Sequence, residues 1–356
     1  MTISSSEYST VSSLLARFDQ ESRGMRLRAQ NATELAAWQN ELRTRLRAII
    51  GLDSFCACPL DPQIDTPEQC DGYVQTRVVI AVEPDVRMPL YVLTPDDLRP
   101  GQRRPVMLAP HGHGSAGKAA VVGRADAPEL ARTIVQHNYA YGVQLVRAGY
   151  IVLCPDARGF GERREPVMLV DGDLLGSSCR VLNNMAIPLG QTVTGMWTWD
   201  LMRLLDYVAT RADCDATRIG CAGLSGGGAQ TLWLAALDDR VRCAVVSGYF
   251  YGYKDALLRL STNCSCNYVP GLWQLADMGD IGALLAPRPL LIETGRQDDL
   301  NGERGVANVT EQLDITRQAY ALLGTEDRLA HTVFEGGHRW DGTAVLPWLA
   351  RWLMSP

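Results

Sequence analysis

The chain has 356 residues, of which 46% are hydrophobic, and its 34 Lys and Arg against 40 Asp and Glu give a formal net charge of -6. This length and apolar content predict a folded globular protein with a substantial core, and without a long basic block we expect no nucleic-acid partner. The first residues lack a basic start followed by an apolar run, and no stretch of about 18 uncharged apolar residues occurs anywhere. We therefore expect a cytoplasmic protein with no membrane partner.

Residues 1–72 are predicted to form a helical segment and a connecting loop ahead of the main domain. In NATELAAWQNELRTRLRAII, Asn31 and Glu34 are spaced as in a capping box, and apolar residues recur at helical spacing. The apolar face consists of Leu35, Trp38, Leu42, Leu46 and Ile49. This face must cover either the main domain or a second subunit, so a homo-oligomer formed through the N-terminal helices stays open.

Residues 73–356 are predicted to form an α/β domain, with a mostly parallel central sheet and helices on both faces. YVQTRVVIAV and MPLYVLTP indicate an opening hairpin, after which short apolar runs alternate with stretches of helix length. The predicted strands are 105–110, 150–155, 218–223, 241–248, 289–295 and 330–337, and the helical stretches lie near 127–147, 193–211, 226–237, 303–322 and 342–353. Ligands bind beyond the carboxyl ends of such strands, so we expect the chemistry in the loops that follow them.

The stretch RIGCAGLSGGGAQ places one serine, Ser225, between a predicted strand and a predicted helix. Gly223, Ser225 and Gly227 fit the pattern G-x-S-x-G of a nucleophile elbow, in which small residues let the strand and the helix approach each other. A phosphate-binding loop would need a Lys after the glycines, and a dinucleotide fingerprint belongs in the first strand-helix unit, so both are disfavoured. A tight turn whose glycines serve only packing is the remaining alternative.

A serine hydroxyl needs a base to accept its proton and a third group to orient that base. Of the five histidines, His338 directly follows the last predicted strand and is the candidate base, whereas His137 and His331 are expected to be structural or on the surface. The acid should lie between the serine and the histidine in chain order. The segment LLIETGRQDD offers Asp298, which is the preferred candidate, with Asp299 and Glu293 as competitors.

An acyl-transfer site also needs two N–H donors for a developing oxyanion. The first is expected to be the backbone N–H of Gly226, and the second should come from the loop HGHGSAGK after the strand at 105–110. In that loop we expect the N–H of His113, or else that of Gly114, to point at the oxyanion. A zinc site at His111 and His113 is the competing interpretation, and it is disfavoured because no cluster of further ligands accompanies them.

The ten cysteines do not make a disulfide scaffold in a chain of this size. Those inside apolar strand-like runs are expected to be buried, reduced thiols: Cys154, Cys221 and Cys243. Two close pairs stand out, Cys56 with Cys58 and Cys264 with Cys266. Four thiolates could bind zinc if the pairs met, but nothing in the sequence brings them together, so we expect loop cysteines and no metal.

Other loops are predicted to shape the site. Asp156 and Arg158, in the loop after the strand at 150–155, are expected to form an ion pair that fixes this loop, in preference to the alternative that they contact the substrate directly. The segment 168–191 and the loop NCSCNYVPGLWQ at 263–274 follow strands and are expected to wall the pocket. The aromatic candidates for its lining are Tyr268, Trp273 and Trp340.

Together these motifs resemble the α/β-hydrolase superfamily over most of residues 73–356. HGHG, PDARGFGER, GLSGGG, CNYVPG, LLAPRPLLIETG and GGH are similar to those of its dienelactone hydrolase and acetyl xylan esterase-like branch. The resemblance implies the α/β-hydrolase fold, a serine esterase without cofactor, an acid at the position of Asp298, and acetylated carbohydrate as the substrate. The N-terminal helical segment is not part of the minimal fold, and dienelactone hydrolases proper use a cysteine where this chain has Ser225.

The sequence therefore predicts a serine hydrolase that cleaves small carboxylic esters, of short-acyl or acetyl type, through an acyl-enzyme on Ser225. A serine peptidase or amidase would use the same triad, and it is disfavoured because no β-propeller domain precedes the catalytic part. A non-catalytic binding protein on a hydrolase scaffold is the third hypothesis. The presence of Ser225, Asp298 and His338 together argues against it.

Overall fold

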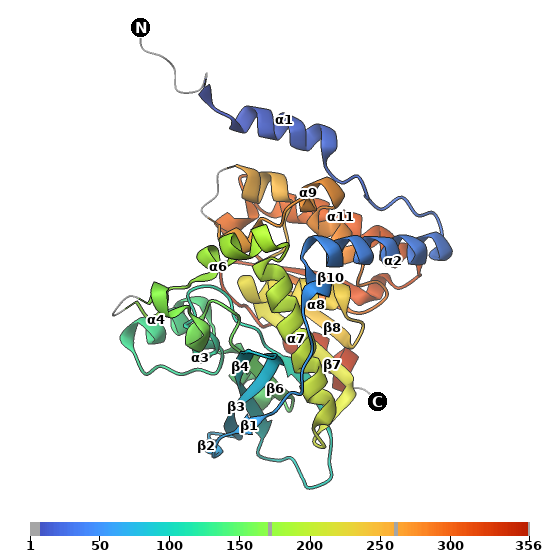
Figure 1. The fold of residues 1–356 in the computed structure, drawn as a ribbon. Coiled ribbons are helices and arrows are strands. Elements are labelled where there is room, and N and C mark those ends of the chain that lie inside the picture. Colours follow the sequence, from blue (N-terminus) through green and yellow to red (C-terminus); the bar gives the residue numbers. More distant parts are fainter. Residues whose placement is uncertain (1–7, 170–172, 260–262, 355–356) are drawn as a thin grey trace.

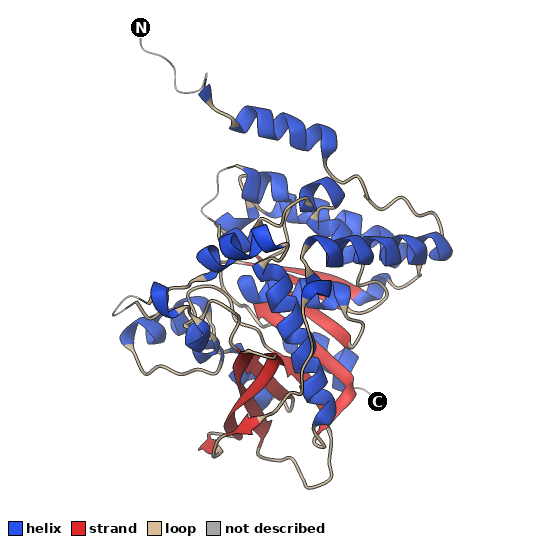
Figure 2. Cartoon of the chain, in the orientation of Figure 1, coloured by secondary structure: helices blue, strands red, loops and turns tan. Residues whose placement is uncertain are grey.

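A single sheet runs through the computed structural model, which describes residues 8–169, 173–259 and 263–354. Within these ranges ten strands join in the order β1-β3-β4-β6-β5-β7-β8-β9-β10, and β2 pairs with β3 beside this path. The strands are β1 (Gln63–Ile64), β2 (Glu68–Cys70), β3 (Tyr73–Glu83), β4 (Val86–Pro95), β5 (Arg104–Leu108), β6 (Ile151–Pro155), β7 (Cys214–Leu224), β8 (Val241–Ser247), β9 (Leu290–Gly295) and β10 (Leu329–Phe334). Figure 2 shows the strands, in red, surrounded by helices.

The sheet has an antiparallel end and a parallel end. The strands β3 and β4 form the predicted hairpin, β4 pairs with β6 in antiparallel fashion, and β6, β5, β7, β8, β9 and β10 are parallel neighbours. The prediction of a mostly parallel sheet is therefore confirmed. Because the parallel strands share one direction, the loops after β5, β7, β9 and β10 meet at one edge of the sheet.

Helices fill the connections between the parallel strands and cover the sheet (Figure 1). They are α1 (Val11–Glu21), α2 (Ala32–Ile49), α3 (Lys118–Val121), α4 (Pro128–His137), α5 (Tyr141–Arg147), α6 (Cys179–Ala186), α7 (Val193–Thr210), α8 (Gly226–Leu237), α9 (Leu272–Leu275), α10 (Met278–Ala283), α11 (Val306–Leu322) and α12 (Val345–Leu349). The stretch near 127–147 is two helices rather than one. Asn138 ends α4 in the left-handed conformation, with φ 50°, which asparagine tolerates better than most residues.

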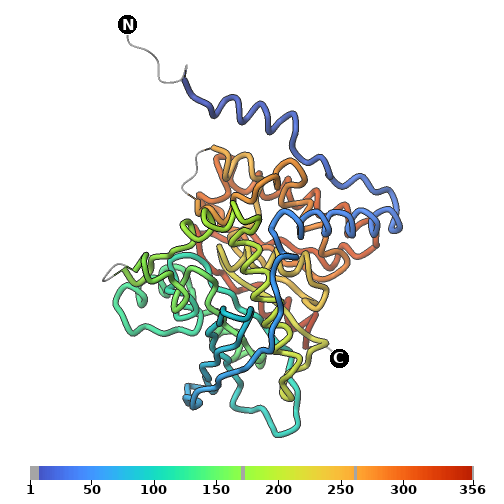
Figure 3. Tube along the Cα trace, in the orientation of Figure 1, coloured from blue at the N-terminus to red at the C-terminus, as the bar shows by residue number. Residues whose placement is uncertain are grey.

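The apolar face predicted for residues 31–50 covers the rest of the chain. The side chain of Asn31 caps α2 by accepting the N–H of Glu34 at 3.0 Å, and Leu35, Leu42 and Leu46 are fully buried. Gln39 Nε2 donates to the carbonyls of Ala283 and Ala286 at 3.0 and 2.9 Å. In the structure α2 lies against α8 and α11, and Figure 3 shows it, in blue, crossing the orange and red C-terminal half.

The segment between α1 and α2 is bound to α10 through one buried carboxylate. Asp280 accepts two hydrogen bonds from the Arg23 guanidinium, at 2.7 and 2.9 Å, and one from the Leu27 N–H at 3.2 Å. The same carboxylate accepts the N–H of Asp277, so it also belongs to the capping box that begins α10. One acidic side chain thus connects the N-terminal segment to the main body.

Over the described residues, every helix is too short or too polar to cross a lipid bilayer. The cytoplasmic location, the division of the chain into 1–72 and 73–356, and a homo-oligomer through the N-terminal helices stay predictions. The face of α2 that could have joined two subunits is occupied by the chain's own core.

We predict that Leu42→Ala lowers the free energy of unfolding by about 2 to 5 kcal/mol, because it opens a cavity where α2 meets the main body. Leu14→Ala, on the exposed face of α1, is the matched leucine control and should change stability by less than about 1 kcal/mol. Urea unfolding of both full-length variants measures the difference. Equal losses in the two would contradict the docking of α2 described here.

Candidate active site

Ser225 lies at the sharp turn between β7 and α8. Its backbone has φ 59° and ψ -121°, which residues with a side chain seldom adopt, and it directly precedes the first residue of the helix. The N–H of Ser225 donates to the Ser247 carbonyl at the end of β8, and its own carbonyl accepts the N–H of Ala229 at 2.9 Å. Two neighbouring elements therefore hold the strained turn, as expected of a nucleophile elbow.

The glycines around Ser225 are required by close backbone approach. A Cβ atom on Gly223 would lie 2.5 Å from the carbonyl group of Gly227, and one on Gly227 would lie 2.2 Å from the Pro110 carbonyl oxygen. Neither position has room for a side chain, because real Cβ atoms do not come within 3.0 Å of backbone atoms. The glycines therefore allow the close approach of strand and helix that the sequence predicted, and they also allow the loop after β5 to pass close to the start of α8.

His338 and Asp298 are in direct contact. His338 Nδ1 lies 2.7 Å from Asp298 Oδ2, and the Asp298 side chain is almost fully buried while the imidazole is one quarter exposed. The other oxygen of Asp298 accepts the Leu300 N–H at 3.0 Å. The imidazole also lies over Gly248, where a Cβ would approach it to 3.0 Å, and Gly248 in turn abuts the side chain of Leu224, next to Ser225.

The other two acid candidates do not contact the imidazole in the structure. Asp299 is exposed at the start of a short 3-10 turn. Glu293 is fully buried in β9, where its Oε1 accepts the N–H of Gly342 at 3.0 Å, and burial raises its pKa to about 7. Of the three carboxylates, only Asp298 is hydrogen-bonded to His338 within the described residues.

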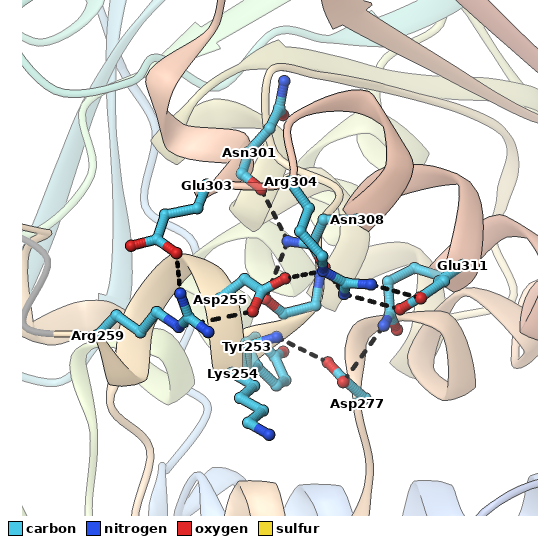
Figure 4. A network of polar contacts seen from close by, with 12 residues as sticks. Tyr253, Lys254, Asp255, Arg259, Asp277, Asn301, Glu303, Arg304, Asn308 and Glu311 are labelled. Carbon is cyan, nitrogen blue, oxygen red and sulfur yellow. Dashed lines mark hydrogen bonds and ion pairs between the residues drawn. The ribbon is translucent and has the colours of Figure 1, made fainter. Parts of the chain in front are cut away.

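A polar network behind the Asp298 loop fixes its path. Asn301 Nδ2 donates to the Gly295 carbonyl at 3.1 Å, and Asn308 Nδ2 on α11 donates to the Asn301 carbonyl at 2.8 Å. Arg304 pairs with Asp255, beside Asn308, and Figure 4 shows these side chains gathered between the loop and α11. Sequence patterns gave no indication of this network, since its members come from three segments.

The loop after β5 passes directly beside Ser225. A Cβ on Gly112 would lie 2.6 Å from the Leu224 carbonyl and 3.0 Å from Ser225 Cβ, and one on Gly226 would lie 2.8 Å from His113 Nδ1. The first N–H groups of a helix have no partner within it, which leaves the N–H of Gly226, at the start of α8, available to a ligand. The two expected oxyanion donors, Gly226 and His113, therefore belong to residues in contact.

His111 has a structural position. Its Nε2 accepts the Ala157 N–H at 3.0 Å and its Nδ1 lies 2.9 Å from the Gly112 carbonyl, so it joins the loop after β5 to the loop after β6. Burial lowers its pKa to about 4 and keeps the ring neutral. His137 is also structural, because its Nδ1 lies 2.6 Å from the His338 carbonyl and supports that loop.

The expected ion pair between Asp156 and Arg158 is wrong. Asp156 pairs with buried Lys118, whose Nζ lies 2.5 Å from Oδ2, and Arg158 pairs instead with Asp200 at 2.8 Å and Glu83 at 2.6 Å. Each residue finds its partner on another element, Asp156 on α3 and Arg158 on α7 and at the end of β3. Asp156 and Arg158 both lie in the loop after β6, so ion pairs to other elements hold this loop.

A cleft of about 340 Å³ opens over Ser225 and His338. Its other described lining residues are His113, Ser177, Gly226, Ala229, Tyr249, Tyr251, Asn263, Cys264, Cys266, Asn267 and Leu300. The segments 168–191 and 263–274 therefore contribute walls as predicted, although residues 170–172 lie outside the described residues.

The three aromatic candidates for the lining were wrong. Trp340 is buried against Tyr141, with ring centroids 4.7 Å apart, whereas Trp273 and Tyr268 pack on each other away from this cleft. Tyr249 and Tyr251, just after β8, line the cleft instead. Their position at a strand end is the signal that could have identified them.

The cysteine pairs do not meet as the sequence suggested they could. Cys264 and Cys266 gather with Cys179 and the His113 ring at one wall of the cleft. Cys56 and Cys58 take part in no such group among the described residues. Cys179 begins α6 and carries no local sequence signal for this position.

Comparison with known proteins supports the architecture. Residues 6–321 match the family Abhydrolase_7, described as "Abhydrolase family". The chain belongs to this α/β-hydrolase family. A provisionally named hydrolase of Bacillus subtilis strain 168, YtaP, is 30% identical over 228 residues, which are 63% of this chain and 69% of the relative.

Solved structures share the fold. A provisionally named acetyl xylan esterase from Bacteroides fragilis superposes with a TM-score of 0.76 at 22% identity, covering 92% of this chain and 82% of the other. A glucuronoyl esterase from Solibacter usitatus gives a TM-score of 0.65 at 16% identity, covering 90% and 93%. At identities below 25%, these superpositions show a common fold.

Glu293 predicts a pH dependence of stability. Its folded pKa of about 7 exceeds the ordinary 4.5, so between these values the folded state binds more protons than the unfolded state, and stability falls as pH rises through this window. The Glu293→Gln variant has no ionisable group at this position, so its free energy of unfolding should not fall in this way. The free energy of unfolding of the variant minus that of the wild type should therefore increase by about 2 kcal/mol from about pH 5.5 to about pH 8.5. Urea unfolding at both pH values measures this, and a constant difference would contradict a buried, neutral Glu293.

Proposed function

We propose that this protein is a serine esterase in which Ser225 is the nucleophile, His338 the base and Asp298 the orienting acid. The observation that carries the proposal is the 2.7 Å contact between His338 and Asp298 in the cleft over the strained turn of Ser225. Each residue follows a different parallel strand, in the order expected for this fold. A turn serving only packing would have no need of a buried carboxylate and an imidazole at the same cleft.

The hydrogen bond to Asp298 determines how the imidazole would act. With Nδ1–H donated to the carboxylate, Nε2 carries a lone pair and can accept the proton of Ser225 as Oγ attacks an ester carbonyl. The backbone N–H groups of Gly226 and His113 would stabilise the oxyanion that forms. Collapse releases the alcohol, protonated by His338, and water then attacks the acyl-enzyme by the same steps.

Small neutral esters fit the cleft best. Its volume of about 340 Å³ is at the lower end for ligand pockets, and its described lining includes neither Lys, Arg, Asp nor Glu. An anionic substrate such as a uronate would lack a cationic partner among these residues. Acetyl or other short-acyl esters of carbohydrates therefore suit the site, in agreement with the acetyl xylan esterases among the structural neighbours.

We expect Ser225→Ala to lower kcat for a small activated ester by about 10³ to 10⁶-fold, because the acyl-enzyme can no longer form. The wild type should be labelled by a fluorophosphonate and the variant should not. Intact-mass spectrometry after labelling measures this, with unfolding curves to show that the variant is folded. Near-normal turnover by the variant would rule out Ser225 as the nucleophile.

Asp298→Asn should lower kcat by about 10³ to 10⁴-fold, because an amide cannot stabilise the imidazolium and favours the wrong tautomer. Asp299→Asn is the matched control, one residue along the same loop, and should retain activity within about 2-fold. Steady-state kinetics on the same ester compares them. A greater loss in Asp299→Asn would transfer the role of the acid to that residue.

An ester panel distinguishes the remaining alternatives. Hydrolysis of acetyl, butyryl and longer esters, sugar acetates included, is compared with that of matched amides, with and without fluorophosphonate. We expect acetyl esters to give the highest kcat/KM and the label to abolish the activity. Faster cleavage of amides would indicate a peptidase or amidase, and a protein that neither turns over nor takes the label would indicate a binding protein.

A further inference from the structure

We propose that His113, Cys179, Cys264 and Cys266 form a zinc-binding site in the wall of the candidate active-site cleft. One ligand atom from each residue lies within 4.8 Å of the other three. Among the described residues, this is the one group of His, Cys, Asp and Glu side chains close enough together to hold a metal ion. Three thiols and one imidazole are a common donor set of structural zinc, which prefers four nitrogen and sulfur ligands. The inference revises the expectation from sequence that the protein binds no metal.

The distances suit a tetrahedral ion. Zinc bonds of about 2.3 Å to sulfur and about 2.0 Å to nitrogen place tetrahedral ligand atoms about 3.5 to 3.8 Å apart. Cys266 Sγ lies 3.7 Å from His113 Nε2, and Cys179 Sγ lies 3.2 Å from Cys264 Sγ. The remaining pairs of ligand atoms also lie within 4.8 Å, so the four side chains can surround a single ion.

The surroundings support a bound metal rather than a chance cluster of thiols. Asn267 Nδ2 donates to Cys266 Sγ at 3.7 Å and to the Cys264 carbonyl at 3.1 Å, and such N–H···S contacts offset thiolate charge around a metal. The His113 ring is held edge to face by Phe160 and Trp197, at centroid distances of 5.0 and 6.3 Å. Its Nε2 is thereby directed at the thiols, while Nδ1 lies beside Gly226.

The four ligands come from three distant parts of the chain. His113 follows β5, Cys179 begins α6, and the loop of Cys264 and Cys266 lies between β8 and α9. An ion here would join these segments by closing long loops of chain. With four protein ligands the coordination sphere is closed, so the ion would have no open position for a substrate.

Such an ion would hold parts of the cleft in position and would take no part in the reaction itself. It would fix the imidazole of His113 and with it the backbone N–H expected to contact the oxyanion, and it would anchor the two loops that wall the cleft. This role depends on the proposed esterase function, whereas the presence of the site does not.

The metal content of the full-length protein tests the inference. Protein purified without chelator from zinc-containing medium should hold about one zinc ion per chain by elemental analysis. The double variant Cys179→Ser with Cys264→Ser should hold less than about one tenth of that. Cys56→Ser, which changes an exposed cysteine outside the group, is the matched control and should retain the metal.

A second measurement keeps the inference testable if the double variant does not fold. The wild-type protein, stripped of metal, is titrated with Co²⁺ alone. Tetrahedral thiolate coordination should give intense visible d–d bands and a sulfur-to-cobalt charge-transfer band at one equivalent. Addition of zinc to the stripped protein should raise its Tm by about 5 °C or more.

Three results would overturn the inference. They are a wild-type chain that retains no zinc, a cobalt titration without thiolate bands, and a Cys179–Cys264 disulfide in protein prepared without oxidant, seen by peptide mass spectrometry. Fluorophosphonate labelling of Ser225 is measured on the same samples. Labelling without zinc contradicts only the metal site, and zinc without labelling contradicts only the esterase, so the two failures are distinguishable.

Discussion

The close approach of the loop after β5 to the turn at Ser225 is the constraint on which the rest of the site depends. Gly112, Gly223 and Gly227 leave no room for a side chain at this crossing, so the serine, the start of α8 and the expected oxyanion loop are fixed by one set of backbone contacts. The positive φ of Ser225 is tolerated because its own N–H and carbonyl are hydrogen-bonded to the end of β8 and to the first turn of α8. Strain is thus concentrated where the hydroxyl must project into the cleft.

Buried ion pairs hold the loop after β6, which lies next to the loop after β5. Asp156, in the loop after β6, pairs with Lys118 on α3, and Asp200 on α7 pairs with Arg158 and Arg163 of the same loop, so each of these buried carboxylates has a cationic partner. Removing one member of such a pair leaves its partner charged in a poorly hydrated interior, which makes these pairs costly to disturb. The neutral His111 joins the loops after β5 and β6 through its hydrogen bond with the Ala157 N–H.

Features set by residues close together in the chain could be predicted from the sequence, whereas most contacts between distant segments could not. The elbow at Ser225 and the cap at Asn31 follow from spacing along one strand-turn-helix or one helix, and chain order was enough to select Asp298 and His338 as partners. The partners of Asp156, the lining role of Tyr249 and the place of Cys179 depend on how separate elements pack. Nothing in the residues around Cys179 shows that α6 begins beside His113. The sequence therefore indicated the contact between Asp298 and His338 better than the walls of the cleft around them.

The carboxylate of Asp280 has a consequence for the boundaries of the folded unit. It is fully buried and receives Arg23 and the Leu27 N–H, so a chain that began after Leu27 would leave an acid in the core with neither its counter-ion nor one of its donors. The segment from Arg23 to Leu27 therefore belongs to the packed interior of the folded unit. Homologous chains shortened at this end would be expected to replace the acid on α10 as well.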